Sequence, residues 1–107
     1  MFVLHVDLKV KPGSEQDLEN TFVGTFISAV SQQNGFRGVT LLCPFEGDVS
    51  DYRLSIAFDD RSCQQKWVAT DLHQMIWPQM EGHCLTFSVK NFLSVGAAES
   101  ARSQAHV

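Results

Sequence analysis

Apolar and polar side chains alternate along the start of the chain. In FVLHVDLKV (2–10) every even position from Phe2 to Val10 is apolar, and most odd positions are polar. A period of two is typical of a strand with one buried face. In the next apolar segment (36–45), Pro44 suggests an edge strand or the end of the strand. Three further strands are predicted at 36–45, 52–58 and 85–95.

A period of four follows the first strand. Large apolar residues recur every four positions, with two more on the adjoining stripe: Leu18, Phe22, Phe26 and Val30, then Val23 and Ile27. This pattern predicts an amphipathic helix of about five turns with its apolar side inward. Ser14 is a suitable N-cap for this helix, and the sequence QQNG at 32–35 is typical of its end.

A second helical region is predicted from DDRS (59–62) to about Met80, with an interruption. As a single helix, WVATDLHQMIWP (67–78) would show an apolar residue on every side, which a surface helix does not do. Thr70 and Asp71 could cap a fresh short helix instead, and Pro78 limits how far that helix runs. In either geometry the segment faces both the sheet and something else, namely a cavity, a partner subunit or both.

The order of elements is β-α-β-β-α-β. We therefore predict an α+β, ferredoxin-like βαββαβ fold, with a four-stranded antiparallel sheet and both helices on one face. Residues 1–95 form the predicted domain. Residues 96–107 lose nearly all large apolar side chains, so a mobile or loosely helical tail is expected there.

Composition narrows the classes of function. The 107 residues fit one domain, and a formal net charge of −4 with eight scattered Lys and Arg argues against a nucleic-acid partner. Neither an apolar run long enough for a membrane span nor a signal peptide is visible, so a cytoplasmic location is expected. Cys43, Cys63 and Cys84 lack CxxC spacing and are predicted to be small buried residues in a reducing compartment, with zinc or redox roles as the alternatives.

Four segments occur at characteristic intervals: HVDLKVKPGSEQDLENTF, NGFRGVTLL, DYRLSIAFDD and KWVATDLHQ. Together they resemble the antibiotic biosynthesis monooxygenase family of dimeric α/β barrel proteins, and the resemblance covers residues 2 to about 93. It implies a homodimer whose two sheets face each other, and a pocket in each subunit between sheet and helices. Some members oxidise aromatic polyketides with molecular oxygen and no metal or flavin, whereas others break down haem.

The haem-degrading branch can be compared residue by residue. Its members carry an asparagine on the first strand, a tryptophan on the second helix and an iron-ligating histidine ten residues later. Trp67 matches the tryptophan, but the asparagine position falls on or beside Val6 and the histidine position on Trp77. His73 lies about one turn earlier and is expected to point elsewhere. The sequence therefore disfavours haem degradation.

The resemblance favours a cofactor-independent monooxygenase that acts on a small aromatic or phenolic substrate, with oxygen as co-substrate and no metal site. His73 is the candidate catalytic base. The candidate substrate-binding residues are Trp67 and Trp77 as aromatic walls, Tyr52 and Asn34 as polar contacts, and Phe22 and Phe26 as pocket lining. Each of these residues also has an ordinary structural reading, as core packing, dimer packing or helix termination.

Two other classes of function stay open. The chain could be a non-catalytic binder of a small aromatic or apolar ligand, or a dimeric regulatory subunit with a vestigial pocket. His5 and Asp7 share one face of the first strand and could form a metal or acid–base pair, although a hydrogen-bonded patch inside the dimer is favoured. The adjacent His83 and Cys84 support metal binding only weakly.

Overall fold

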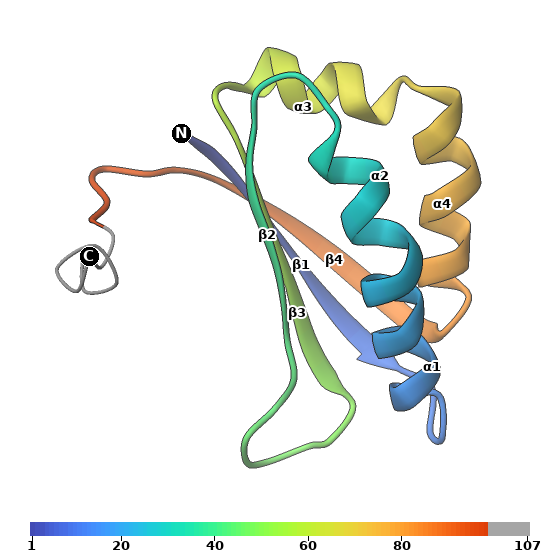
Figure 1. The fold of residues 1–107 in the computed structure, drawn as a ribbon. Coiled ribbons are helices and arrows are strands. Elements are labelled where there is room, and N and C mark those ends of the chain that lie inside the picture. Colours follow the sequence, from blue (N-terminus) through green and yellow to red (C-terminus); the bar gives the residue numbers. More distant parts are fainter. Residues whose placement is uncertain (99–107) are drawn as a thin grey trace, which may run out of the picture.

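The computed structural model describes residues 1–98 and has the predicted ferredoxin-like architecture, with a helical layer over one face of a sheet (Figure 1). All strand pairs are antiparallel, and the strand order is β2-β3-β1-β4. The sheet of the single chain stays open. The elements are β1 (Phe2–Val10), α1 (Glu15–Thr21), the π-helical η1 (Phe22–Phe26), α2 (Ile27–Ser31), β2 (Phe36–Leu42), β3 (Asp51–Phe58), α3 (Arg61–Val68), α4 (Asp71–Glu81) and β4 (Cys84–Leu93).

The strands agree with the sequence pattern except at their ends. β2 stops at Leu42, two residues before Pro44, because proline has no N–H to give to the ladder. β4 ends at Leu93 rather than Val95. The tail expected at 96–107 falls mostly outside the described residues, of which only 96–98 belong to it, and these form no helix or strand.

The first helical region turns wider than an α-helix in its middle. An α-helix has 3.6 residues per turn, so a side chain four residues after another is rotated about 40° past it around the helix axis. In the π-helical segment η1 the backbone hydrogen bonds join residues five apart, which widens the turn and offsets this rotation. Phe22 and Phe26 both stay buried, whereas Val23, expected on the apolar side, is 68% exposed.

The second helical region is interrupted as predicted. α3 ends at Val68, and Thr70 caps α4 by accepting a hydrogen bond from the backbone N–H of His73 at 3.1 Å. Pro78 lies inside α4, which ends three residues later at Glu81, close to the predicted end near Met80. Figure 1 shows α3 across one end of the sheet and α4 turning down beside the first helix.

The core lies between the helices and one sheet face. The even positions of β1, β3 and the inner sides of the helices supply its fully buried side chains: Val10, Leu18, Phe26, Val30, Leu54, Phe58, Trp67 and Met80. β4 differs from the other strands because all of its residues after Cys84 are exposed. Among the described residues, no helix is long and apolar enough to cross a membrane.

Candidate functional site

A cavity of about 340 Å³ opens between the helical layer and the sheet. This volume is at the lower end of the range for small-molecule sites. Every strand except β2 contributes to its floor, and α3 and α4 form the opposite wall. Its lining residues are Leu4, Val6, Phe26, Ile56, Arg61, Gln64, Trp67, Val68, His73, Trp77, Phe87, Val89 and Asn91.

Aromatic rings form a continuous series along the cavity. The edge of Phe26 meets Trp67 at a centroid distance of 6.3 Å, and Trp67 meets His73 edge-on at 5.0 Å. His73 lies nearly parallel to Trp77 at 6.5 Å, and Trp77 meets Phe87 edge-on at 5.3 Å. Edge-to-face and stacked pairs at these distances are mutually attractive. The series therefore gives the cavity fixed, flat apolar walls.

His73 carries a nitrogen that the protein leaves without a partner. Its Nδ1 atom is buried and has no hydrogen-bond partner among the described residues. Burial lowers the pKa of His73 below its ordinary value of 6.5, because an apolar environment disfavours the charged ring. The neutral imidazole then predominates at neutral pH, and a neutral ring can accept a proton at one of its nitrogens.

The two indoles differ in what they offer a ligand. The Nε1 of Trp77 donates a hydrogen bond to Oε1 of Glu81 at 3.0 Å, so this N–H is already engaged. Trp67 is 2% exposed and belongs to the core, with one edge toward the cavity. Trp77 therefore does not match the expectation of an N–H free to bind a ligand oxygen.

Three polar lining residues were missed by the sequence reasoning: Arg61, Gln64 and Asn91. Arg61 and Gln64 lie six and three residues before Trp67, a spacing that keeps them on one side of a helix. Asn91 pairs with Leu4 across the sheet and continues the alternation of Phe87 and Val89. Both spacings were readable from the chain once Trp67 and Phe87 were taken as reference points.

The remaining predicted site residues lie elsewhere. Phe22 and Tyr52 line a separate hollow of about 160 Å³ beside Glu19. The hydroxyl of Tyr52 donates to Glu19 at 2.5 Å, and burial, followed by this carboxylate, raises the pKa of Tyr52. Asn34 is exposed in the turn between α2 and β2. The structure thus brings His73, Trp67, Trp77 and Phe26 together and separates the other three from them.

The candidate haem ligands do not assemble. Val6 lines the cavity with an apolar side chain where the haem-degrading branch has an asparagine, and Trp77 stands at the histidine position. The expectation that His73 points elsewhere is wrong, because His73 stacks with Trp77 and lines the same cavity. Within residues 1–98, no group of three or more His, Cys, Asp or Glu side chains is placed to hold a metal ion.

The cysteines and the paired candidates outside the cavity make separate contacts. The three cysteines are free thiols, and only Cys84 is buried. Asp7 bonds Arg53 at 2.7 Å rather than His5, and His5 packs against Phe92. His83 hydrogen-bonds Thr21 at 3.0 Å.

The structure resembles several solved structures along nearly its whole length. A mutant of SnoaB, described as a cofactor-independent oxygenase from Streptomyces nogalater, has 16% identity and a TM-score of 0.79, covering 92% of this chain and 97% of its own. An antibiotic biosynthesis monooxygenase has 14% identity and a TM-score of 0.75, covering 90% of this chain and 100% of its own. A conserved protein from Methanosarcina mazei Go1 has 14% identity and a TM-score of 0.74, covering 86% of this chain and 91% of its own. At these identities the likeness establishes the fold.

The sequence itself carries the family assignment. A comparison with curated protein sequences found no match. The family model for antibiotic biosynthesis monooxygenase, in contrast, matches residues 1–76, from β1 into α4 and including Trp67 and His73. This match spans well over half of the chain, which therefore belongs to the antibiotic biosynthesis monooxygenase family.

Proposed function

We propose that this protein is a monooxygenase that oxidises a small aromatic or phenolic substrate in the cavity between sheet and helices, without a metal or flavin. The observation that carries the proposal is the unpartnered Nδ1 of His73, held between Trp67 and Trp77 in an aromatic-lined cavity. A buried polar atom without a partner is costly, and a catalytic role is one of the recognised reasons why a protein keeps such an atom.

The first chemical step assigned to His73 is removal of the substrate's hydroxyl proton by its imidazole ring, which lines the cavity. The resulting phenolate is electron-rich and passes one electron to molecular oxygen, giving a phenoxyl radical and superoxide. The two radicals combine and form a carbon–oxygen bond at a ring carbon. His73 returns its proton to the peroxide, which loses water together with the ring hydrogen. One oxygen atom ends as a ring carbonyl and the other as water.

The remaining cavity residues hold the ring in place. Trp67 and Phe26 form the wall beside α3, and Trp77 and Phe87 form the wall beside α4. A flat substrate between these walls is oriented by ring contacts, and the largely apolar lining keeps water from the anion. Holding the reacting groups in place is worth several orders of magnitude in rate.

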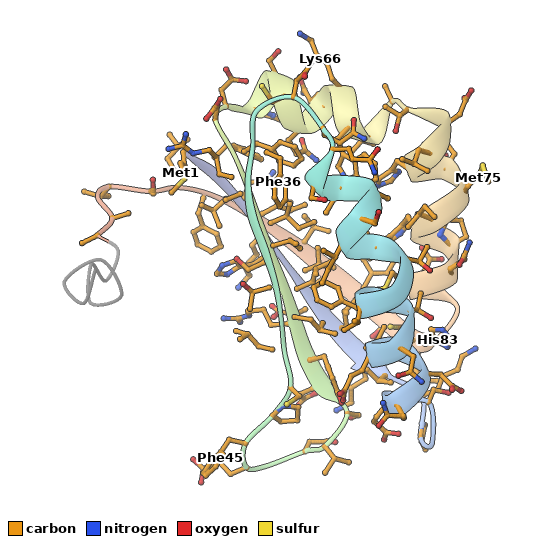
Figure 2. The ribbon with its side chains drawn as sticks, viewed as in Figure 1. Met1, Phe36, Phe45, Lys66, Met75 and His83 are labelled. Atoms are coloured by element: carbon orange, nitrogen blue, oxygen red, sulfur yellow. The ribbon has the colours of Figure 1, made fainter. Side chains whose placement is uncertain are left out.

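Oxygen uptake in metal-free buffer tests the proposal with a panel of phenols, naphthols and quinols. We expect uptake with at least one flat phenolic substrate, and His73→Ala should slow it by about 10²-fold or more, as for loss of a general base. His73→Gln tests the same loss with a side chain of similar size. His83→Gln is the matched control, because His83 lies at the far end of α4 (Figure 2). An unchanged rate in both His73 variants removes His73 from the mechanism.

The competing function is non-catalytic binding of a small aromatic ligand in the same cavity. The fixed aromatic walls favour this function as much as they favour catalysis. A ligand that binds only the folded state raises the melting temperature. Ligand-induced stabilisation without oxygen uptake across the whole panel would therefore support the binder and contradict the oxygenase.

We also propose that two copies form a homodimer through the sheet faces that the helices leave uncovered. Val3, Ala57 and Phe92 are cross-strand neighbours on that face, and Phe92 is 46% exposed. The ion pair between Asp7 and Arg53 lies on the same face. A second sheet would bury this apolar patch and close the open sheet into a barrel of two subunits.

A further inference from the structure

We propose that Arg61 makes the cavity selective for aromatic substrates that carry an anionic group, such as a ring carboxylate. This inference deepens the proposed function and rests on the same cavity. Among the described residues that line the cavity, Arg61 alone is charged and none is a carboxylate. The lining therefore presents one positive charge beside an otherwise neutral, largely apolar space.

The guanidinium of Arg61 is not neutralised by its neighbours. No carboxylate among residues 1–98 lies within ion-pairing distance of it. The two acids that directly precede it in the chain make other contacts. Asp59 pairs with Arg37 at 3.4 Å, and Asp60 accepts a hydrogen bond from the backbone N–H of Cys63 at 2.9 Å. The five N–H donors of an arginine suit a planar carboxylate, which they can bind through two parallel hydrogen bonds.

Arg61 also occupies a position where it does not help the fold. It is the first residue of α3, and the positive end of a helix dipole is an unfavourable place for a cation. The first turn of α3 holds no acidic residue, and the carboxylate of the N-cap residue Asp60 bonds the backbone N–H of Cys63 and forms no ion pair with Arg61. The stability of α3 thus does not explain an arginine at this position. Binding of an anionic ligand in the cavity does explain it.

The geometry of α3 sets the shape of the preferred substrate. Arg61, Gln64 and Trp67 follow one side of the helix, and six residues of helix correspond to about 9 Å along its axis. An anion held at Arg61 therefore directs the rest of the substrate under α3 toward Trp67 and His73. The amides of Gln64 and Asn91 lie along the same cavity and can bond polar ring substituents. A fused-ring hydroxy acid fits this arrangement.

Ligand binding tests this inference without requiring turnover. Trp67 and Trp77 are the only tryptophans of the chain, and both line the cavity, so their fluorescence reports its occupancy. We compare 1-hydroxy-2-naphthoate with 1-naphthol, which lacks the carboxylate, under nitrogen, with calorimetry as the second readout. The naphthoate should bind about tenfold more tightly to the natural protein, and added salt should weaken that preference.

Arg61→Gln should remove about tenfold of the naphthoate affinity, leave 1-naphthol binding unchanged and not lower the melting temperature. Lys66→Gln is the matched control, because it removes a positive charge from the same helix on the side that points away from the sheet (Figure 2). Equal affinity for the two ligands, or an equal loss of both in Arg61→Gln, overturns the inference. Selective binding without oxygen uptake across the panel upholds it while contradicting the oxygenase. Failure of both ligands to bind contradicts this inference, and the oxygenase is then decided by the panel.

Discussion

The imidazole of His73 meets the indole of Trp67 edge-on, with ring centroids 5.0 Å apart and planes at 87°. The two residues belong to different helices, and Thr70 joins them. Its hydroxyl donates to the backbone carbonyl of Trp67 at 2.7 Å and accepts from the backbone N–H of His73 at 3.1 Å. One side chain thus closes α3, opens α4 and fixes the angle at which the two rings face the cavity.

Replacing Thr70 with Ala should destabilise the protein and misplace His73. Loss of a threonine N-cap costs about 1 kcal/mol of unfolding free energy. A small displacement of a positioned catalytic group lowers kcat/KM, here by about tenfold. Urea unfolding and steady-state oxygen uptake measure the two effects. Thr70→Ser keeps the hydroxyl and should retain both properties, so an equally impaired Ser variant would contradict the role given to the hydroxyl.

The pH dependence of the reaction should report His73. Burial lowers the pKa of this group below 6.5, and the proton-accepting form is the neutral ring. The value of kcat/KM should therefore rise with pH through a midpoint below 6.5 and then level off, since higher pH only completes the deprotonation. His73→Gln should lose this acidic limb. A midpoint above 6.5, or a limb that survives in the Gln variant, would assign the titration to another group.

Tyr52→Phe should affect stability but not catalysis. The substitution removes the hydroxyl that donates to Glu19, and losing one partner of such a bond costs about 1 kcal/mol. Tyr52 faces the small hollow beside Phe22 rather than the cavity that holds His73. Chemical unfolding should show the loss, while KM and kcat stay unchanged. A raised KM in a fully folded variant would return Tyr52 to the list of substrate contacts.

Phe92→Asp should weaken the proposed dimer. The substitution places a charge beside Val3, in the middle of the apolar patch that a second sheet would cover, and burying an unpaired charge is strongly unfavourable. Sedimentation velocity at micromolar concentration should show a dimer for the natural protein and a shift toward monomer for the variant. Met75→Asp is the control, because Met75 points outward from α4 (Figure 2). A natural protein that sediments as a monomer contradicts the homodimer.

The sequence by itself determined the order of elements and the inward faces of most of them. The even positions of β1 are buried, or half-buried at Leu4, because a strand alternates its side chains. The break at Thr70 follows from the apolar residues on every side of the segment around it. These are local properties, since propensity, capping and periodicity act over a few residues. The likeness to the monooxygenase family could also be read from the chain because it depends on ordered segments.

The tertiary structure alone decided which candidates share a site. Phe22 and Phe26 are one helical repeat apart, yet they border different hollows, because the π-helical turn and the placement of α3 determine what each ring faces. Asn91 reaches the cavity through its pairing with Leu4, a contact between residues far apart in the chain. Cavity walls form from side chains of separate elements, and local periodicity does not specify how those elements pack against one another.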